Sequence, residues 1–138
     1  MPAIQTRETA QQPDPVSGSG QPPEIADGKT WVAVCAPQEI VRNTGVCALV
    51  NGRQIAVFHI VQGEAEARHF AIDNFDPNCQ AAVLSRGIVG SIGERIVVAS
   101  PLYKQHFDLM TGECLEVPEN SVRAHPTRVA DGMLWIAA

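Results

Sequence analysis

The Asn51-Gly52 pair constrains the fold of this chain more than any other local feature of its sequence. It separates two apolar runs, VCALV (46–50) and RQIAVFHI (53–60). Asn-Gly between apolar runs is typical of a two-residue hairpin in which both turn residues have positive φ. The sequence therefore predicts a β-hairpin over residues 46–60.

Short apolar runs separated by turn residues continue along the rest of the chain. Further strands are expected at 30–35, 68–73, 94–100 and 106–109, in a Thr-Gly turn-and-strand unit at 110–117, and in an Asp131-Gly132 hairpin within 121–137. One or two helical turns are expected after Pro37, and no long amphipathic helix or internal repeat is present. Eight or nine short strands of this kind predict an all-β domain of small antiparallel sheets, either a barrel or a sandwich.

The first 28 residues differ in composition from the rest. They contain five prolines among Gln, Ser and Gly, without a hydrophobic period. This pattern predicts a flexible N-terminal tail over residues 1–28 and a folded domain over 29–138.

Charge and hydropathy exclude some partners. The formal net charge of −5 argues against nucleic acid and anionic membranes, which select clustered Lys and Arg. No apolar run approaches the roughly 20 residues of a membrane span. The N-terminus shows neither the basic start nor the apolar region of a signal peptide, so a cytoplasmic protein with reduced thiols is expected.

Considered without any family resemblance, the sequence shows no recognisable catalytic set. The four cysteines have no metal-ligand spacing: Cys35 and Cys47 are predicted to be buried in strands, and Cys79 and Cys114 to be more exposed in or near loops. The four histidines are far apart in sequence, and His106 has no obvious partner.

Two segments, AIDNFDPNCQAAVLSRG (71–87) and VASPLYKQHFDLMTGECL (98–115), together resemble the two cluster-binding loops of Rieske domains. In a Rieske [2Fe–2S] centre, each loop supplies one Cys and one His. In register with that pattern, the ligand positions of this chain are occupied by Asp76, Asn78, Ser100 and Tyr103. The resemblance implies an all-β Rieske-like domain, whereas hard oxygen ligands do not suit a cluster that requires soft thiolates. No cofactor or metal is therefore expected in this chain.

VLSRGIVG and SPLYKQHFDLMTGECLE are similar to the loops of one family in particular, the small subunits of assimilatory NADH-dependent nitrite reductase. The resemblance covers roughly residues 29–137. It implies a subunit without its own catalytic centre that binds a large subunit holding FAD, siroheme and an iron–sulfur cluster. The large subunit would reduce nitrite to ammonium.

Within this resemblance, the end of the domain where a cluster would lie is expected to face the partner. The candidate partner-binding residues are Arg86, Tyr103, Lys104, Gln105 and His106. In the alternative interpretation, Tyr103 packs inside the space left by the cluster and Ser100 forms a hydrogen bond across the loops.

Two other functions remain open at this point. One is a genuine Rieske-type ferredoxin that supplies electrons to an oxygenase, against which the missing ligands argue. The other is an independent binding module or thiol protein that uses Cys79 or Cys114, supported only by their loop positions.

Overall fold

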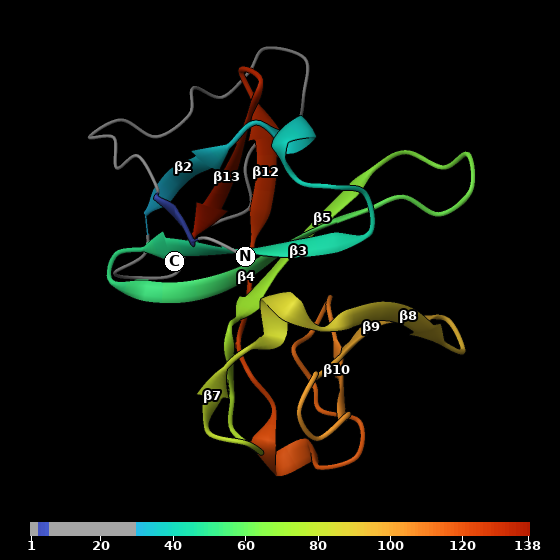
Figure 1. Cartoon of the computed structure of the whole chain (residues 1–138). Coiled ribbons are helices and arrows are strands. Elements are labelled where there is room, and N and C mark those ends of the chain that lie inside the picture. The colour runs from blue at the N-terminus through green and yellow to red at the C-terminus, as the bar shows by residue number, and fades with distance from the viewer. Residues whose placement is uncertain (1–2, 6–29) are drawn as a thin grey trace.

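A five-stranded sheet crosses the middle of the molecule and is built around the predicted hairpin (Figure 1). The computed structural model describes residues 3–5 and 30–138. The hairpin strands are β3 (Thr44–Val50) and β4 (Arg53–Ile60), which pair antiparallel from Val50–Arg53 to Thr44–His59. The turn residues Asn51 and Gly52 have φ values of 51° and 80°, as the Asn-Gly pair predicts.

The remaining strands of this sheet flank the hairpin. On one side, β5 (Arg68–Asp73) pairs with β4, and β11 (Ala124–His125) pairs with β5, both antiparallel. On the other side, β1 (Ala3–Gln5) pairs parallel to β3. Apart from β1, the flexible tail predicted for residues 1–28 lies outside the described residues.

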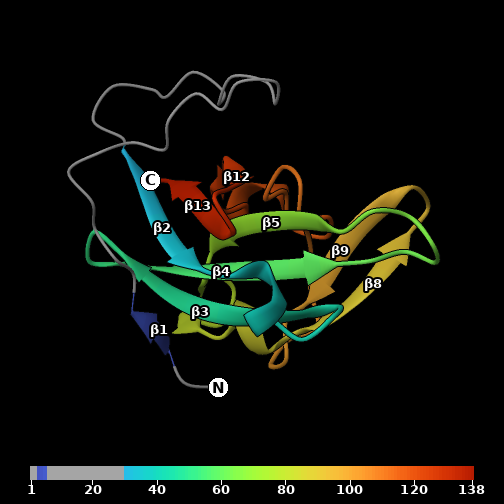
Figure 2. The ribbon, with the colours of Figure 1, turned by 90° about the horizontal axis from the view of Figure 1, so that it is seen from above.

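A second sheet packs above the first and contains β2 (Trp31–Cys35), β12 (Thr127–Ala130) and β13 (Met133–Ala137) (Figures 1 and 2). The predicted turn at Asp131-Gly132, with φ values of 54° and 75°, connects β12 to β13. In Figure 2, β2 and β13 lie across the β3–β4–β5 sheet.

The lower half of the molecule in Figure 1 holds the two loops identified in the sequence. It contains a two-stranded sheet of β6 (Phe75–Asp76) and β7 (Ala81–Ala82), and a three-stranded sheet of β8 (Ile88–Ile92), β9 (Arg95–Ala99) and β10 (His106–Asp108).

Three short 3₁₀ turns complete the described part of the chain: η1 (Pro37–Glu39), η2 (Leu84–Arg86) and η3 (Pro118–Asn120). The first of them is the helical turn predicted after Pro37. Over residues 3–5 and 30–138, no helix reaches the length and apolarity that crossing a membrane requires.

The central sheet is buried on both faces, which explains why β4 is almost continuously apolar. Ile55 and Val57 of β4 pack upward into a core shared with β2 and β13. Ala56, Phe58 and Ile60 pack downward into a second core shared with β9 and β10. The hairpin therefore joins the upper sheets to the loop-bearing half.

One predicted element is wrong. Residues 110–117 begin with a Gly112 turn at φ 81°, as expected, but they continue without a strand beyond a single bridge between Phe107 and Cys114. Two backbone hydrogen bonds flank this bridge, from Asp108 N–H to the Glu113 carbonyl at 2.8 Å and from Leu115 N–H to the His106 carbonyl at 2.9 Å. The backbone N–H of Cys114 donates to the Ser121 hydroxyl over 2.9 Å, and the pairing extends no further. The all-β class and the small antiparallel sheets are as predicted, with β1–β3 as a parallel pair.

Candidate functional site

The two loops meet at a buried contact between their predicted ligand positions. Asp76 ends β6 in the first loop, and Ser100 follows β9 at the start of the second. Both residues have 0% of their surface exposed. The Ser100 hydroxyl donates a hydrogen bond to Asp76 Oδ2 over 2.6 Å and joins the loops across 24 positions of sequence.

Asp76 accepts three further hydrogen bonds within its own loop. Its Oδ1 receives the backbone N–H of Asn78 at 2.9 Å and the Asn78 side-chain amide at 3.1 Å. Its Oδ2 also receives the Cys79 thiol at 3.3 Å. A buried carboxylate is costly unless donors surround it, and these four donors supply that environment.

Asn78 extends the network to the segment after the second loop. Its side-chain oxygen accepts a hydrogen bond from Asn120 over 2.9 Å, and its amide lies 3.7 Å from the Cys114 sulfur. Three segments, around Asp76, Ser100 and Asn120, are therefore held together by side-chain hydrogen bonds. The predicted hydrogen bond of Ser100 across the loops is confirmed.

Tyr103 does not share this interior. The second loop closes through backbone hydrogen bonds from Ser100 to Gln105 at 2.8 Å and from Lys104 to Ser100 at 3.0 Å. Lys104 has a φ of 66°, and Tyr103 is 60% exposed. The alternative in which Tyr103 fills the interior is wrong, because Asp76 and its hydrogen-bond donors occupy the space between the loops.

These side chains do not fit a [2Fe–2S] cluster. A Rieske cluster of this kind is held by two thiolates and two imidazoles. The positions in register hold a carboxylate and a hydroxyl bonded to each other, an amide bonded to the carboxylate, and an exposed phenol. Within the described residues, no three His, Cys, Asp or Glu side chains are grouped to hold a metal ion.

The cysteines are poorly placed for thiolate chemistry. Cys35 and Cys47 are buried as predicted, and Cys114 is fully buried, contrary to the expected exposure. Cys79 is partly exposed, but burial and the adjacent Asp76 carboxylate raise the pKa of its thiol. Burial, with the nearby Glu39, raises the pKa of Cys35 to about 11. A reactive thiol needs the opposite shift, so neither Cys35 nor Cys79 has the environment of a nucleophile.

Sequence reasoning missed the partner of His106. The Glu116 side chain accepts the His106 backbone N–H at 2.7 Å and lies 2.6 Å from His106 Nδ1. Burial alone would raise the pKa of Glu116, but these hydrogen bonds lower it overall. The contact spans ten residues between a strand and a coil, so no local sequence pattern marks it. His106 is thereby tied to its own loop.

The other histidines also have structural partners. Burial, with the adjacent His59, lowers the pKa of His69, whose ring meets that of His59 edge to face at a centroid distance of 4.8 Å. His125 is buried, and its Nε2 lies 2.8 Å from Asp73 Oδ1. Burial raises the pKa of Asp73, but His125 and Arg53 lower it overall.

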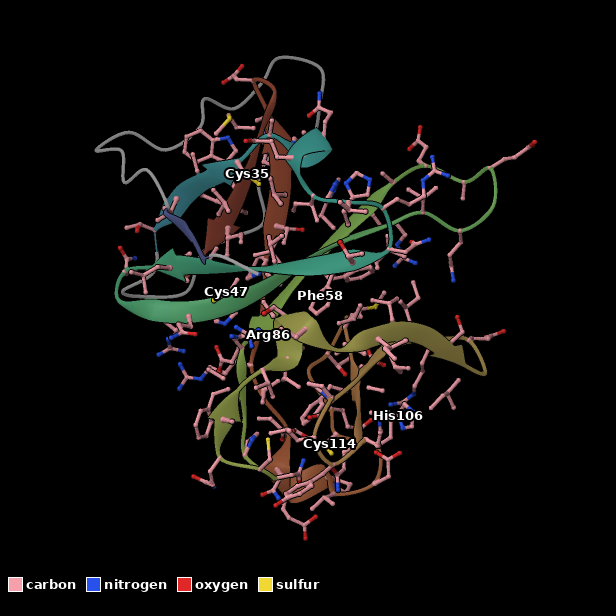
Figure 3. All side chains as sticks on the ribbon, viewed as in Figure 1. Cys35, Cys47, Phe58, Arg86, His106 and Cys114 are labelled. Carbon is pink, nitrogen blue, oxygen red and sulfur yellow. The ribbon has the colours of Figure 1, made fainter. Side chains whose placement is uncertain are left out.

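The five candidate partner-binding residues fall into two places. Tyr103 and Lys104 are exposed in the second loop, while Gln105 and His106 are half-buried beside them. Arg86 is exposed on η2 and lines a pocket under β3. Figure 3 shows Arg86 near Cys47 at the large sheet and His106 lower in the loop half. Among the described residues, no hydrogen bond or ion pair joins Arg86 to the other four.

Comparison with known proteins agrees with the resemblance found in the sequence, and it covers most of the chain. Residues 30–137 match the family model of the Rieske-like [2Fe-2S] domain. The nitrite reductase (NADH) small subunit of Salmonella typhimurium is 41% identical over 106 residues, which cover 77% of this chain and 95% of that protein.

A solved structure and a larger relative add to this result. The solution structure of the nitrite reductase [NAD(P)H] small subunit from Erwinia carotovora is 48% identical, with a TM-score of 0.65 over 78% of this chain and 81% of that one. The nitrite reductase [NAD(P)H] large subunit of Klebsiella oxytoca is 36% identical over 122 residues, which are 88% of this chain but 12% of that protein.

Proposed function

Because the chain belongs to the Rieske-like family of nitrite reductase small subunits, we propose that it works as the small, non-catalytic subunit of an NAD(P)H-dependent nitrite reductase in the cytoplasm. The observation that supports this most directly is its 41% identity over 95% of a nitrite reductase (NADH) small subunit. In the complex, the large subunit holds FAD, siroheme and an iron–sulfur cluster and reduces nitrite to ammonium.

The Klebsiella oxytoca relative supports a physical association with the large subunit. In that protein, a region equivalent to 88% of this chain is part of a polypeptide named as the large subunit. Joining two domains in one chain keeps their effective concentration high, which favours domains that work in contact. The same two parts are expected to associate as separate chains here.

The role proposed for this chain needs no redox group of its own. The side chains at three of the four ligand positions bond to one another: Ser100 donates to Asp76, and Asp76 also accepts from Asn78. We therefore assign to the domain a docking and supporting role rather than an electron-transfer role.

The second loop is the proposed contact surface for the large subunit. Leu102 and Tyr103 are 55% and 60% exposed, beside the charged Lys104. Tyrosine is enriched at the centres of protein interfaces. Tyr103→Ala should leave the fold unchanged and weaken binding to the large subunit about tenfold. Val129→Ala removes another exposed apolar side chain, 48% exposed in β12, and is the matched control.

The proposed function is tested by metal analysis and binding on the same preparation. The chain is purified anaerobically, assayed for iron and acid-labile sulfide, and mixed with the purified large subunit. We expect no stoichiometric iron or sulfide, together with a stable complex. Two irons per chain would instead identify a Rieske-type ferredoxin, and failure to bind the large subunit would remove the docking role.

A variant that restores the ligands provides the positive control for metal analysis. It places Cys or His at the four positions in register: Asp76→Cys, Asn78→His, Ser100→Cys and Tyr103→His. After reconstitution with iron and sulfide, this variant is expected to gain the visible absorption of a cluster, whereas the natural chain is not. Equal incorporation in both chains would show that the cluster ligands lie elsewhere.

A further inference from the structure

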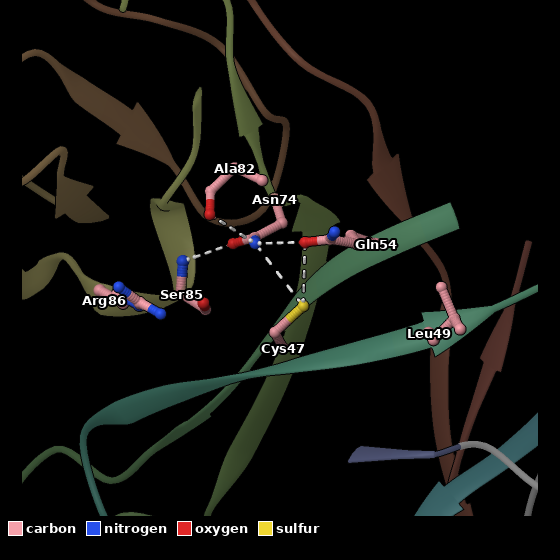
Figure 4. A pocket seen from close by; sticks show the side chains of 7 residues that line it. All are labelled: Cys47, Leu49, Gln54, Asn74, Ala82, Ser85 and Arg86. Atoms are coloured by element: carbon pink, nitrogen blue, oxygen red, sulfur yellow. Dashed lines mark hydrogen bonds between the residues drawn. The ribbon is translucent and has the colours of Figure 1, made fainter. Parts of the chain in front are cut away.

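A pocket of about 270 Å³ lies under the large sheet, apart from the Asp76–Ser100 contact (Figure 4). The downward faces of β3 and β4 form its roof, and β7 and η2 form its floor. The side chains that line it are those of Cys47, Leu49, Gln54, Asn74, Ala82, Ser85 and Arg86. Gly45 allows η2 to approach the sheet, because a Cβ at that position would lie 2.6 Å from the Phe58 ring and 2.9 Å from the Ser85 carbonyl oxygen.

Asn74 holds the polar wall of this pocket in a fixed arrangement. Its side-chain oxygen accepts the Ser85 backbone N–H at 2.7 Å, and its amide donates to the Ala82 carbonyl at 3.1 Å and to Gln54 Oε1 at 3.3 Å. The Cys47 thiol also donates to Gln54 Oε1, over 3.5 Å. Because its oxygen is engaged twice, Gln54 retains its NH₂ group as the available donor of its amide.

The pocket is a positive site on an acidic chain. Of the described residues that line it, Arg86 alone is charged, whereas the chain as a whole has a net charge of −5. Among the described residues Arg86 forms no ion pair, unlike Arg53, which lies 3.6 Å from Asp73. Burial raises the pKa of the Cys47 thiol, and the positive charge of Arg86 acts in the opposite direction, so the charge of Arg86 on η2 is felt across the pocket at β3.

These features specify the chemistry of an occupant. A guanidinium binds a carboxylate in a two-pronged, charge-assisted contact. The Ser85 hydroxyl and the Gln54 amide add donors at the same pocket. The volume lies just below the roughly 300 Å³ at which pockets for drug-sized ligands begin, so the pocket suits one side chain better than a three-atom anion.

We propose that this pocket receives an acidic side chain of the large subunit, whose carboxylate pairs with Arg86. The proposal rests on the proposed function, since it names a second contact of the same complex. It adds a separate anchor to the second-loop surface. The partner residue is a Glu or Asp on a protruding segment, because the pocket is recessed beneath β3.

Two variants, each with a matched control, test the charge of Arg86 and the space of the pocket separately. Arg86→Gln removes the charge, and Arg42→Gln changes another exposed arginine outside the pocket. Ala82→Phe keeps the charge and fills the pocket, and Ala65→Phe adds the same bulk in the exposed turn before β5. The dissociation constant of each small subunit for the purified large subunit is measured at low and high salt, with thermal unfolding as the check on folding.

We expect Arg86→Gln and Ala82→Phe each to weaken binding about tenfold at low salt, with both controls near the natural chain. Arg86→Gln should also reduce the salt dependence of binding. If Arg86→Gln weakens binding but Ala82→Phe does not, Arg86 acts outside the pocket and the proposal is wrong. If neither variant weakens an otherwise tight complex, the proposal fails while the proposed function stands. If the natural chain does not bind the large subunit, both fail.

Discussion

Removal of the Ser100 hydroxyl should cost far more stability than its small size suggests. Ser100→Ala deletes one hydrogen bond to a buried carboxylate, at 2.6 Å between fully buried residues. Hydrogen bonds to charged groups contribute about 1.5–3 kcal/mol, so the free energy of unfolding should fall by about 2 kcal/mol. Asp76 keeps its contacts with Asn78 and Cys79, which limits the loss to this one bond.

Asp76→Ala should be more severe because it removes the acceptor of four donors. Asn78 and Cys79 are partly exposed and regain some hydrogen bonding from water, so we expect a loss of about 4 kcal/mol rather than four full hydrogen bonds. The double variant should lose less than the sum of the two single variants. The difference, about 1.5 kcal/mol, is the coupling between the two side chains.

The assay is urea unfolding of the isolated chain followed by far-UV circular dichroism and tryptophan fluorescence. Trp31 and Trp135 lie in a separate buried cluster on the sheet of β2, β12 and β13, so coincident transitions of the two signals would show that this sheet unfolds together with the rest of the chain. Ser91→Ala removes an exposed hydroxyl and Glu66→Ala removes an exposed carboxylate, and both serve as controls. If Ser100→Ala lowers the free energy of unfolding no more than Ser91→Ala does, and the losses of the two single variants add up in the double variant, the buried contact does not join the loops.

Three further predictions follow from the titratable groups. The pKa of Asp73 is lowered next to His125, so the stability that Asp73 contributes is present above its unfolded pKa of about 3.9 and is lost as pH falls through its folded pKa. Asp73→Asn should therefore lower the melting temperature at neutral pH. The difference from the natural chain should vanish below both pKa values. The lowered pKa of His69 means that the unfolded chain binds its proton first, so stability should fall as pH drops below about 6.5, and His69→Gln should flatten that slope in melting temperatures. In a thiol titration, Cys79 should react first but more slowly than free cysteine, and Cys114 should react only on unfolding; a fast phase that survives in Cys79→Ser would contradict this.

The features of the fold that could be predicted from the sequence are those set by neighbouring residues. Asn51-Gly52 specifies its turn locally, and the apolar runs on either side specify the strands, so β3 and β4 could be placed. The segment 110–117 could not, because its pairing with β10 is limited to the single bridge between Phe107 and Cys114, and the Cys114 N–H donates to the Ser121 hydroxyl. Apolar residues alone do not show whether a backbone N–H meets a carbonyl or a hydroxyl.

The candidate site also has a part that the sequence indicates and a part that it does not. The ligand-like frame brought Asp76, Asn78 and Ser100 into consideration, and the structure gathers all three. Their mutual bonds depend on how loops 24 residues apart close on each other, which spacing does not specify. The outward direction of Tyr103 follows from the backbone bonds that close its loop and from the positive φ of Lys104. Neither is visible from residue types, since lysine rarely adopts that conformation.

The buried contact between Asp76 and Ser100 also bears on how the protein matures. In a metalloprotein whose loops are joined through a cluster, the last stage of folding waits for iron and sulfide to be delivered, because metal binding is coupled to folding. Here the atoms that join the loops are encoded in the polypeptide itself. The two loops of this chain are therefore joined as soon as its side chains have packed.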